Sequence, residues 1–117
     1  MAREKKKLKT YELMVALKPL LPDELRKSMH KEFVDMMSKD GGEVLDVDVW
    51  GKRYLSYKIQ GHNEGYYLVY NFVHTPKNIN EMKRVLQLRQ EILRFMIIEV
   101  DNTEIIGKGI KKKEIEV

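Results

Sequence analysis

The chain has 117 residues, of which 43% are hydrophobic and 34% are charged, and it contains no cysteine. This is the size and composition of one globular domain, which buries a core without disulfides or a metal. The absence of cysteine excludes disulfides, thiol nucleophiles and cysteine-ligated zinc. The longest apolar run, residues 13–17, is too short to cross a membrane, and the charged N-terminus lacks the apolar segment of a secretory signal. We therefore expect an intracellular protein with no membrane partner.

The net charge of +4 is concentrated at the N-terminus. Residues 1–9 hold five basic side chains and one acidic side chain, whereas residues 10–100 and residues 101–117 are each balanced. A basic arm favours polyanions because each phosphate that it neutralises releases a counterion, and the alternative is a solubilising tail. We divide the chain into a basic N-terminal arm over 1–8, one folded domain over 9–100, and an extended C-terminal tail over 101–117.

The first predicted elements are a strand and a helix. Apolar residues alternate over 11–17, which predicts a strand. Pro22 and the two acids that follow it favour a helix start, because a proline and negative charges suit the first turn. Apolar residues then recur at helical spacing until Gly41, where a glycine suits a helix end.

A long run rich in β-branched and aromatic residues, 43–59, predicts the second strand, with a bend at Gly51. A turn is expected over 60–65. The remaining elements follow in order: a third strand over 66–73, a second helix that Thr75 caps and Pro76 opens, and a last strand over 92–100.

The element order β-α-β-β-α-β predicts an α+β, ferredoxin-like sandwich, in which two helices cover one face of a four-stranded antiparallel sheet. Both faces of the predicted third and last strands carry apolar side chains, although a solvated face is normally more polar. The free face of the sheet is therefore expected to bind a partner. The alternatives are that the C-terminal tail covers it or that the protein dimerises.

A search for catalytic and metal-binding patterns finds none. His30, His62 and His74 are far apart in the sequence, so we expect no metal site and interpret His30 as solvent-exposed and His62 as a turn residue. Asp46 and Asp48 share one side of a strand, and without a nearby base or nucleophile we interpret them as a polar strand face. Neither a glycine-rich serine elbow nor a phosphate loop is present. We therefore expect no enzymatic activity, no cofactor and no small-molecule substrate.

Six segments carry a family pattern. They are Lys9-Thr10-Tyr11-Glu12, Leu17-Lys18-Pro19, Gly51-Lys52-Arg53-Tyr54-Leu55-Ser56-Tyr57-Lys58-Ile59, Gly65-Tyr66-Tyr67-Leu68-Val69-Tyr70, Leu86-Gln87-Leu88-Arg89 and Leu93-Arg94-Phe95-Met96. In these segments the chain resembles the bacterial small-subunit ribosomal protein six family, over residues 9–100. The resemblance implies a structural protein of the small ribosomal subunit, cytoplasmic or in an organellar ribosome. It also implies binding to the central domain of small-subunit ribosomal RNA together with ribosomal protein eighteen. The alternative is a homodimeric ferredoxin-like domain that binds a ligand or regulates another process.

The candidate RNA-binding residues are basic side chains in or near these segments. Lys52, Arg53 and Lys58 lie on the bent second strand, where guanidinium and ammonium groups can hold phosphates. Lys9 begins the first strand and Arg94 lies in the last, so one sheet would carry all five. The alternative for each is a solvated surface cation, and we place Arg53 and Arg94 first.

Other conspicuous side chains are expected to have structural roles. We interpret Trp50, Tyr66 and Tyr70 as packing residues, because the chain matches the aromatic pattern of RNA-recognition motifs only in part. Arg89, at the end of the second predicted helix, is expected to offset the helix dipole.

Overall fold

The computed structural model describes residues 8–59 and 61–100, so the predicted basic arm (except Leu8) and the predicted tail lie outside the described residues. The elements in chain order are β1 (Lys9–Leu17), α1 (Asp23–Met37), the short 3-10 helix η1 (Lys39–Gly41), β2 (Glu43–Ile59), β3 (His62–His74), α2 (Pro76–Gln87) and β4 (Ile92–Glu99). Apart from the 3-10 turn, this is the predicted order.

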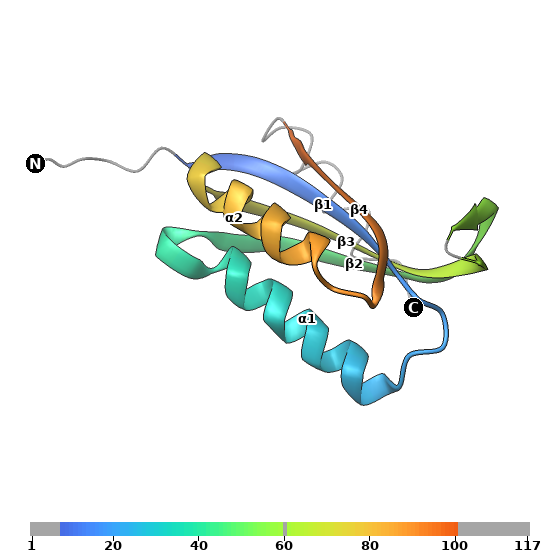
Figure 1. Cartoon of the computed structure of the whole chain (residues 1–117). Coiled ribbons are helices and arrows are strands. Elements are labelled where there is room, and N and C mark those ends of the chain that lie inside the picture. Colours follow the sequence, from blue (N-terminus) through green and yellow to red (C-terminus); the bar gives the residue numbers. More distant parts are fainter. Residues whose placement is uncertain (1–7, 60, 101–117) are drawn as a thin grey trace, which may run out of the picture.

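The four strands form one sheet in the order β2-β3-β1-β4, and each neighbouring pair is antiparallel. Both helices lie on the same face of this sheet, and the β2–β3 hairpin projects beyond them at one end (Figure 1). The arrangement confirms the predicted ferredoxin-like α+β fold. We call the face away from the helices the open face.

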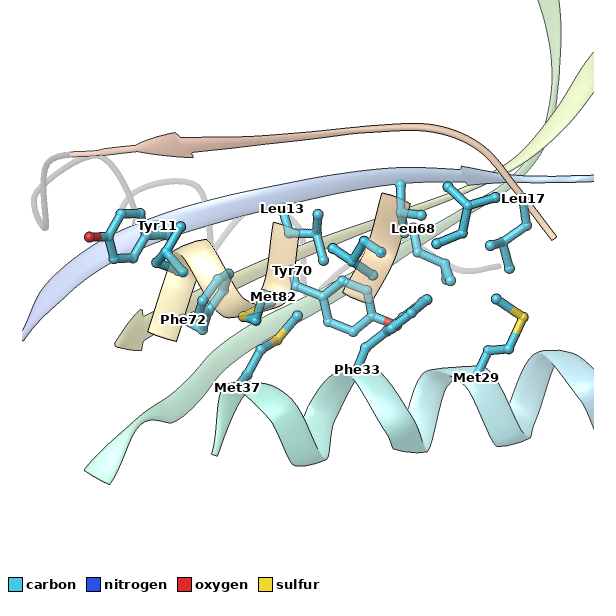
Figure 2. Packing of buried hydrophobic residues seen from close by; sticks show 14 residues of the cluster. Tyr11, Leu13, Leu17, Met29, Phe33, Met37, Leu68, Tyr70, Phe72 and Met82 are labelled. Carbon is cyan, nitrogen blue, oxygen red and sulfur yellow. The ribbon is translucent and has the colours of Figure 1, made fainter. Parts of the chain in front are cut away.

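The hydrophobic core lies between the helices and the sheet (Figure 2). Every second residue of β1, from Tyr11 to Leu17, points into it, and Leu13 and Leu17 have no exposed surface. Phe33 of α1 meets Tyr70 of β3 edge to face, with ring centroids 5.9 Å apart. The period of two in the strand and of about 3.6 in the helix thus bring their apolar faces together.

The turn predicted over 60–65 is present but shorter, because Gly61 is a turn residue with a φ of 81° and β3 already begins at His62. Residues 62–65 pair with the second half of β2, with Ile59 opposite His62 and Arg53 opposite Gly65. This part of the hairpin extends beyond the helices (Figure 1). The polar sequence of residues 62–65 resembled a loop, because a strand that covers no core does not need alternating apolar residues.

The helix boundaries follow local chemistry. The Thr75 side chain caps α2 by accepting a hydrogen bond of 3.3 Å from the Asn78 amide, as predicted. The α1 helix ends at Met37, four residues before Gly41, and the chain turns through Asp40 with a positive φ of 54°. Neither α1 nor α2, the two longer helices of the described chain, has the length and apolar character needed to span a membrane.

Candidate nucleic-acid interface

The bend predicted at Gly51 is present, and it decides which side chains of β2 reach the open face. Gly51 has a φ of 79°, a conformation that favours glycine, and the pairing register shifts between Val49 and Gly51. The extra residue of this bulge is Trp50, which stacks on Tyr67 of the open face. Beyond the bulge, Arg53 lies opposite Gly65 and on the same face as Tyr67.

Arg94 reaches the open face through a second register shift. Leu17 pairs with Ile92 and Ala16 pairs with Arg94, so Leu93 is the extra residue in β4. Ala16 in turn lies opposite Tyr67, and Tyr67 lies opposite Gly51. Arg94 therefore shares a cross-strand row with the bend in β2, three strand spacings or about 14 Å away.

A stacked aromatic pair separates the two arginines. The Trp50 and Tyr67 ring centroids are 6.2 Å apart with an interplanar angle of 22°, and the Arg53 guanidinium is 5.9 Å from the Trp50 centroid. The Trp50 indole donates a hydrogen bond of 2.8 Å to the Asp48 carboxylate. These contacts confirm Trp50 as a packing residue. We call Arg53, Arg94, Trp50 and Tyr67 the basic half of the open face.

The structure separates the other three candidates from the basic half. Lys52 pairs with Tyr66, which places it one residue out of phase with Arg53 and towards the helix side. Lys58 is exposed near the tip of the projecting hairpin. Lys9 lies at the opposite end of β1, seven residues or about 24 Å from Ala16, and forms an ion pair of 3.7 Å with Glu99. The sequence alone therefore overestimated how closely the five cations gather.

Four of the five candidates lack the ion pairs that several other cations of the described chain form. Arg26 pairs with Asp23 and stacks on Tyr66, with its guanidinium 4.3 Å from the ring centroid. In contrast, Arg53 and Arg94 are exposed and form no ion pair with any residue in 8–59 or 61–100, and the same holds for Lys52 and Lys58. Within the described residues, four of the five candidates thus have no carboxylate that neutralises their charge.

Arg89 lies at the C-terminal end of α2, as predicted, because the helix ends at Gln87 and the Arg89 amide donates a hydrogen bond to the Leu86 carbonyl. The sequence did not predict its carboxylate partners. Its guanidinium binds Glu32 of α1 at 2.5 Å and Glu91 at 3.2 Å. Arg89 therefore links the start of β4 to the helix layer, and its charge is neutralised by carboxylates.

Sequence reasoning missed two exposed tyrosines on the projecting hairpin. The exposed fraction of Tyr54 is 83% and that of Tyr57 is 63%. They were interpreted only as strand-forming residues, because residues 54–57 continue the pattern of a buried strand. Their exposure follows from the bend at Gly51, after which β2 leaves the helix layer. Exposed aromatic rings beside cations are a surface on which unpaired bases can stack.

The structure corrects the interpretation of His30 and adds the burial of two carboxylates in β2. His30 is not simply solvated, because its Nδ1 shares a hydrogen bond of 2.7 Å with the Tyr70 hydroxyl across the core. Burial raises the pKa of Tyr70, which keeps that hydroxyl protonated. Asp46 and Asp48 do lie on the open face, but they are buried, with exposed fractions of 8% and 3%. Tyr70 itself has no exposed surface, which confirms its packing role.

A groove with a volume of about 330 Å³ runs beside α1, with Val49, Tyr66 and Leu68 along its sheet side and Arg26 on its helix side. Across the described ranges, no three His, Asp or Glu side chains converge in a way that could hold a metal ion.

The comparisons with known proteins identify the family of this chain. The family model described as Ribosomal protein S6 matches residues 10–99. A relative from Caldanaerobacter subterraneus subsp. tengcongensis, named small ribosomal subunit protein bS6, is 39% identical over 95 residues, which cover 81% of this chain and all of the relative. A relative of the same name from Dictyoglomus turgidum is 38% identical over 97 residues, which cover 83% of this chain and all of that protein.

The fold also matches a solved structure. The crystal structure of 30S ribosomal protein S6 from Thermotoga maritima superposes with a TM-score of 0.77 and 24% sequence identity, covering 90% of this chain and 99% of that one. At this identity the likeness concerns the fold alone, but the family match and the relatives extend it to the sequence. The chain therefore belongs to the ribosomal protein S6 family, which is structural and not enzymatic, as its lack of a catalytic pattern predicted.

Proposed function

We propose that this protein binds the central domain of small-subunit ribosomal RNA, together with ribosomal protein eighteen, as a structural component of the ribosome. Family membership supports the ribosomal role. The observation that carries the RNA contact is the pair of arginines on the open face. The strands that carry Arg53 and Arg94 lie three spacings or about 14 Å apart, and both side chains are exposed and without a carboxylate partner in the described chain.

The chemistry of the basic half suits a folded RNA backbone. An arginine guanidinium donates two parallel hydrogen bonds to one phosphate, and two arginines at this spacing can hold phosphates of separate nucleotides. The Trp50–Tyr67 pair lies between them and forms an apolar surface, and its rings already stack on each other. Recognition would therefore depend on the shape of the RNA more than on its base sequence.

The projecting hairpin extends the proposed contact. Lys58 and the exposed Tyr54 and Tyr57 lie beyond the helix layer, where they can reach a second RNA segment. Lys52 faces the side of the helices at the root of the hairpin. Lys9 is expected to contribute least, because Glu99 already neutralises it and it lies at the far end of the sheet.

A mobility-shift titration against the central-domain junction of small-subunit ribosomal RNA tests the proposal. It is run at two salt concentrations, with and without ribosomal protein eighteen. We expect tight binding that requires the partner and weakens as salt rises, because bound phosphates release counterions. Absence of binding in all four conditions would overturn the RNA role and leave the homodimeric alternative to be tested by sedimentation.

A double variant locates the site. Arg53→Ala/Arg94→Ala is expected to weaken RNA binding by roughly tenfold per arginine and to lower the salt slope by about two phosphates. The matched control is Lys83→Ala/Arg84→Ala, which removes two exposed cations of α2 from the helix layer. Equal losses in the two variants would show that net charge, and not the basic half, determines the affinity.

A further inference from the structure

The groove beside α1 lies on the helix face of the sheet, opposite to the two arginines of the proposed RNA contact. Its volume of about 330 Å³ is at the lower end of the range for small-molecule sites in proteins. The sheet side of the groove consists of three apolar side chains of β2 and β3, namely Val49, Tyr66 and Leu68. We call this cavity the α1 groove.

The helix side of the α1 groove is held in place before any ligand binds. The Arg26 guanidinium donates a hydrogen bond of 3.0 Å to the Leu21 carbonyl and pairs with the Asp23 carboxylate. It also lies 4.3 Å from the centroid of the Tyr66 ring. A side chain that is fixed in this way loses little entropy when a ligand packs against it.

His30 supplies a hydrogen-bond donor at this groove. The fully buried Tyr70 hydroxyl lies 2.7 Å from His30 Nδ1, which is its partner in the described chain. Because a buried hydroxyl proton needs an acceptor, the bond runs from Tyr70 to Nδ1. A neutral imidazole then carries its own proton on Nε2. The His30 ring lines the groove, so Nε2 is the atom that can donate to a ligand there.

Positive charge remains at the groove once its ion pairs are counted. Lys27 lines the groove from α1, and Lys52 lies opposite Tyr66 on the same side of the sheet. Both lysines are exposed, and neither forms an ion pair within the described residues. The one carboxylate among the lining residues, that of Asp23, is already paired with Arg26. The charge of the groove therefore complements an anion.

The size of the α1 groove favours a small molecule over a protein partner. Its helix side runs from Asp23 to His30, seven residues or about 10 Å along the helix axis. A stable protein interface takes about 20–30 residues from each partner, which is far more than this groove offers. A length of about 10 Å instead fits one ring with a short charged arm.

The geometry of Arg26 favours an aromatic ring in the ligand. The hydrogen bonds of its guanidinium lie in the plane of the group, and one face of that plane stacks on Tyr66. The side chain keeps 22% of its surface exposed, so the other face is open to a second ring. Guanidinium groups stack on aromatic faces in this way.

We propose that the α1 groove binds a small aromatic anion. The ring packs on Val49 and Leu68 beside the Arg26 guanidinium. The carboxylate or phosphate of the same molecule pairs with Lys27 and accepts the Nε2 hydrogen bond of His30, because residues three apart on a helix lie side by side. The site goes beyond the proposed RNA role, and the two depend on different faces of the sheet.

An NMR titration of the full chain tests this site, with ¹³C-labelled valine and leucine methyl groups as reporters. The first probe is indole-3-acetate, for which we expect a Kd on the order of 1 mM, as is usual for a ligand of this size. The methyl groups of Val49 and Leu68 should shift to saturation. Those of Leu86, in the core beneath α2, should not move and thereby report an intact fold.

Two comparisons measure the contribution of charge. Indole-3-ethanol, which lacks the carboxylate, should bind about threefold more weakly than indole-3-acetate, as expected for an exposed ion pair. The variant Lys27→Gln should weaken binding of indole-3-acetate by about the same factor. The matched control is Lys83→Gln, which removes an exposed cation of α2 and should leave the affinity unchanged.

Adenosine monophosphate distinguishes the two possible anionic groups. Tighter binding of this nucleotide than of indole-3-acetate, with shifts of the same methyl groups, would support a phosphate ligand. Weaker binding at the same methyl groups would support a carboxylate ligand. In both cases the α1 groove is the site, and only the natural source of the ligand differs.

Three results would overturn the proposal. The first is the absence of a saturable shift at Val49 and Leu68 with both probes. The second is an affinity for indole-3-acetate that changes neither in Lys27→Gln nor on loss of the carboxylate. The third is a short peptide of phenylalanine and glutamate that binds the groove more tightly than both probes, which would assign it to a protein partner. None of these results bears on RNA binding, which the arginine variants test separately.

Discussion

Successive residues of β1 experience two different environments. Leu13, Val15 and Leu17 point towards the helices and have no exposed surface. Met14, between two of them, lies on the open face and is half-buried. The helix face therefore depends on filling a closed volume, whereas the open face depends on which charges the register places side by side.

The open face repeats this contrast within itself. Its acidic part, which contains Asp46 and Asp48, lies where β2 runs under the helix layer, and its basic half lies where β2 bends at Gly51. The same strand thus carries Asp46 and Asp48 on one side of the bend and Arg53 on the other. One face of the sheet therefore packs the core that stabilises the fold, and the other face carries acidic and basic side chains in separate places.

The largest expected effect compares the two faces directly. Leu13→Ala should lower the free energy of unfolding by about 3 kcal/mol, because it opens a cavity in a closed core. Met14→Ala, one residue later on the open face, should cost about 1 kcal/mol, since a half-buried site loses less contact. Urea denaturation of both variants measures the difference, and equal losses would mean that the open face is packed as tightly as the core.

The bend that joins the two halves of the open face gives the next effect. Gly51→Ala should cost about 1–2 kcal/mol, because its φ of 79° disfavours a side chain. The control is Gly65→Ala, where an added Cβ meets Tyr67, Ala16 and Leu93 at ordinary distances of 3.4–3.6 Å. RNA affinity of Gly51→Ala should also fall as Arg53 is displaced. A variant with wild-type stability and affinity would show that the bend does not position Arg53.

A hydrogen bond between His30 and Tyr70 lies on the helix face of the sheet. The pH dependence of stability tests whether water reaches the Tyr70 hydroxyl. Burial raises the pKa of Tyr70 above its ordinary value of 10.0, so its stabilising contribution is complete below that value and is lost as the pH rises further. Tyr70→Phe should cost about 1 kcal/mol at pH 7, because His30 loses its hydrogen bond. Between pH 10 and 11 the variant should lose less stability than the wild type. Parallel losses in thermal denaturation would indicate that water reaches the hydroxyl.

The smallest effect lies at the rim between the two faces. A hydrogen bond from its own backbone amide, and then the Arg89 guanidinium, lower the pKa of Glu91 below its ordinary value of 4.5. Stability from Glu91 is therefore present above that value and is lost as the pH falls through the lowered pKa. Glu91→Gln should cost about 0.5 kcal/mol at pH 7 and nothing at pH 2, because the pair is partly solvated.

Glu81→Gln is the control for this rim contact, since the Glu81–Arg84 pair is longer, at 4.0 Å, and more exposed. It should change the free energy of unfolding by less than the Glu91 variant at pH 7. A larger loss in the control would remove Glu91 from the groups that stabilise the start of β4.

Much of the fold could be predicted because its signals are local. The alternation of β1, the cap at Thr75 and the glycine at position 51 each specify a conformation without reference to distant residues. The start of β3 was missed because residues 62–65 pair beyond the core, where strand composition is polar. The hydrogen bond of His30 and the ion pair of Arg89 were missed because Tyr70 and Glu32, their partners, are 40 and 57 residues away.

The candidate site, like the fold, could be predicted from the sequence only in part. The sequence alone identified the cations and their family pattern, because residue type and spacing are sufficient for that. Which of them meet was decided only by the tertiary structure, since the register shifts at Gly51 and at Leu93 place Arg53 and Arg94 on one face and leave Lys9 at the far end. A slip of one residue moves a strand side chain to the opposite face, and cross-strand pairing, which no local pattern encodes, determines the result.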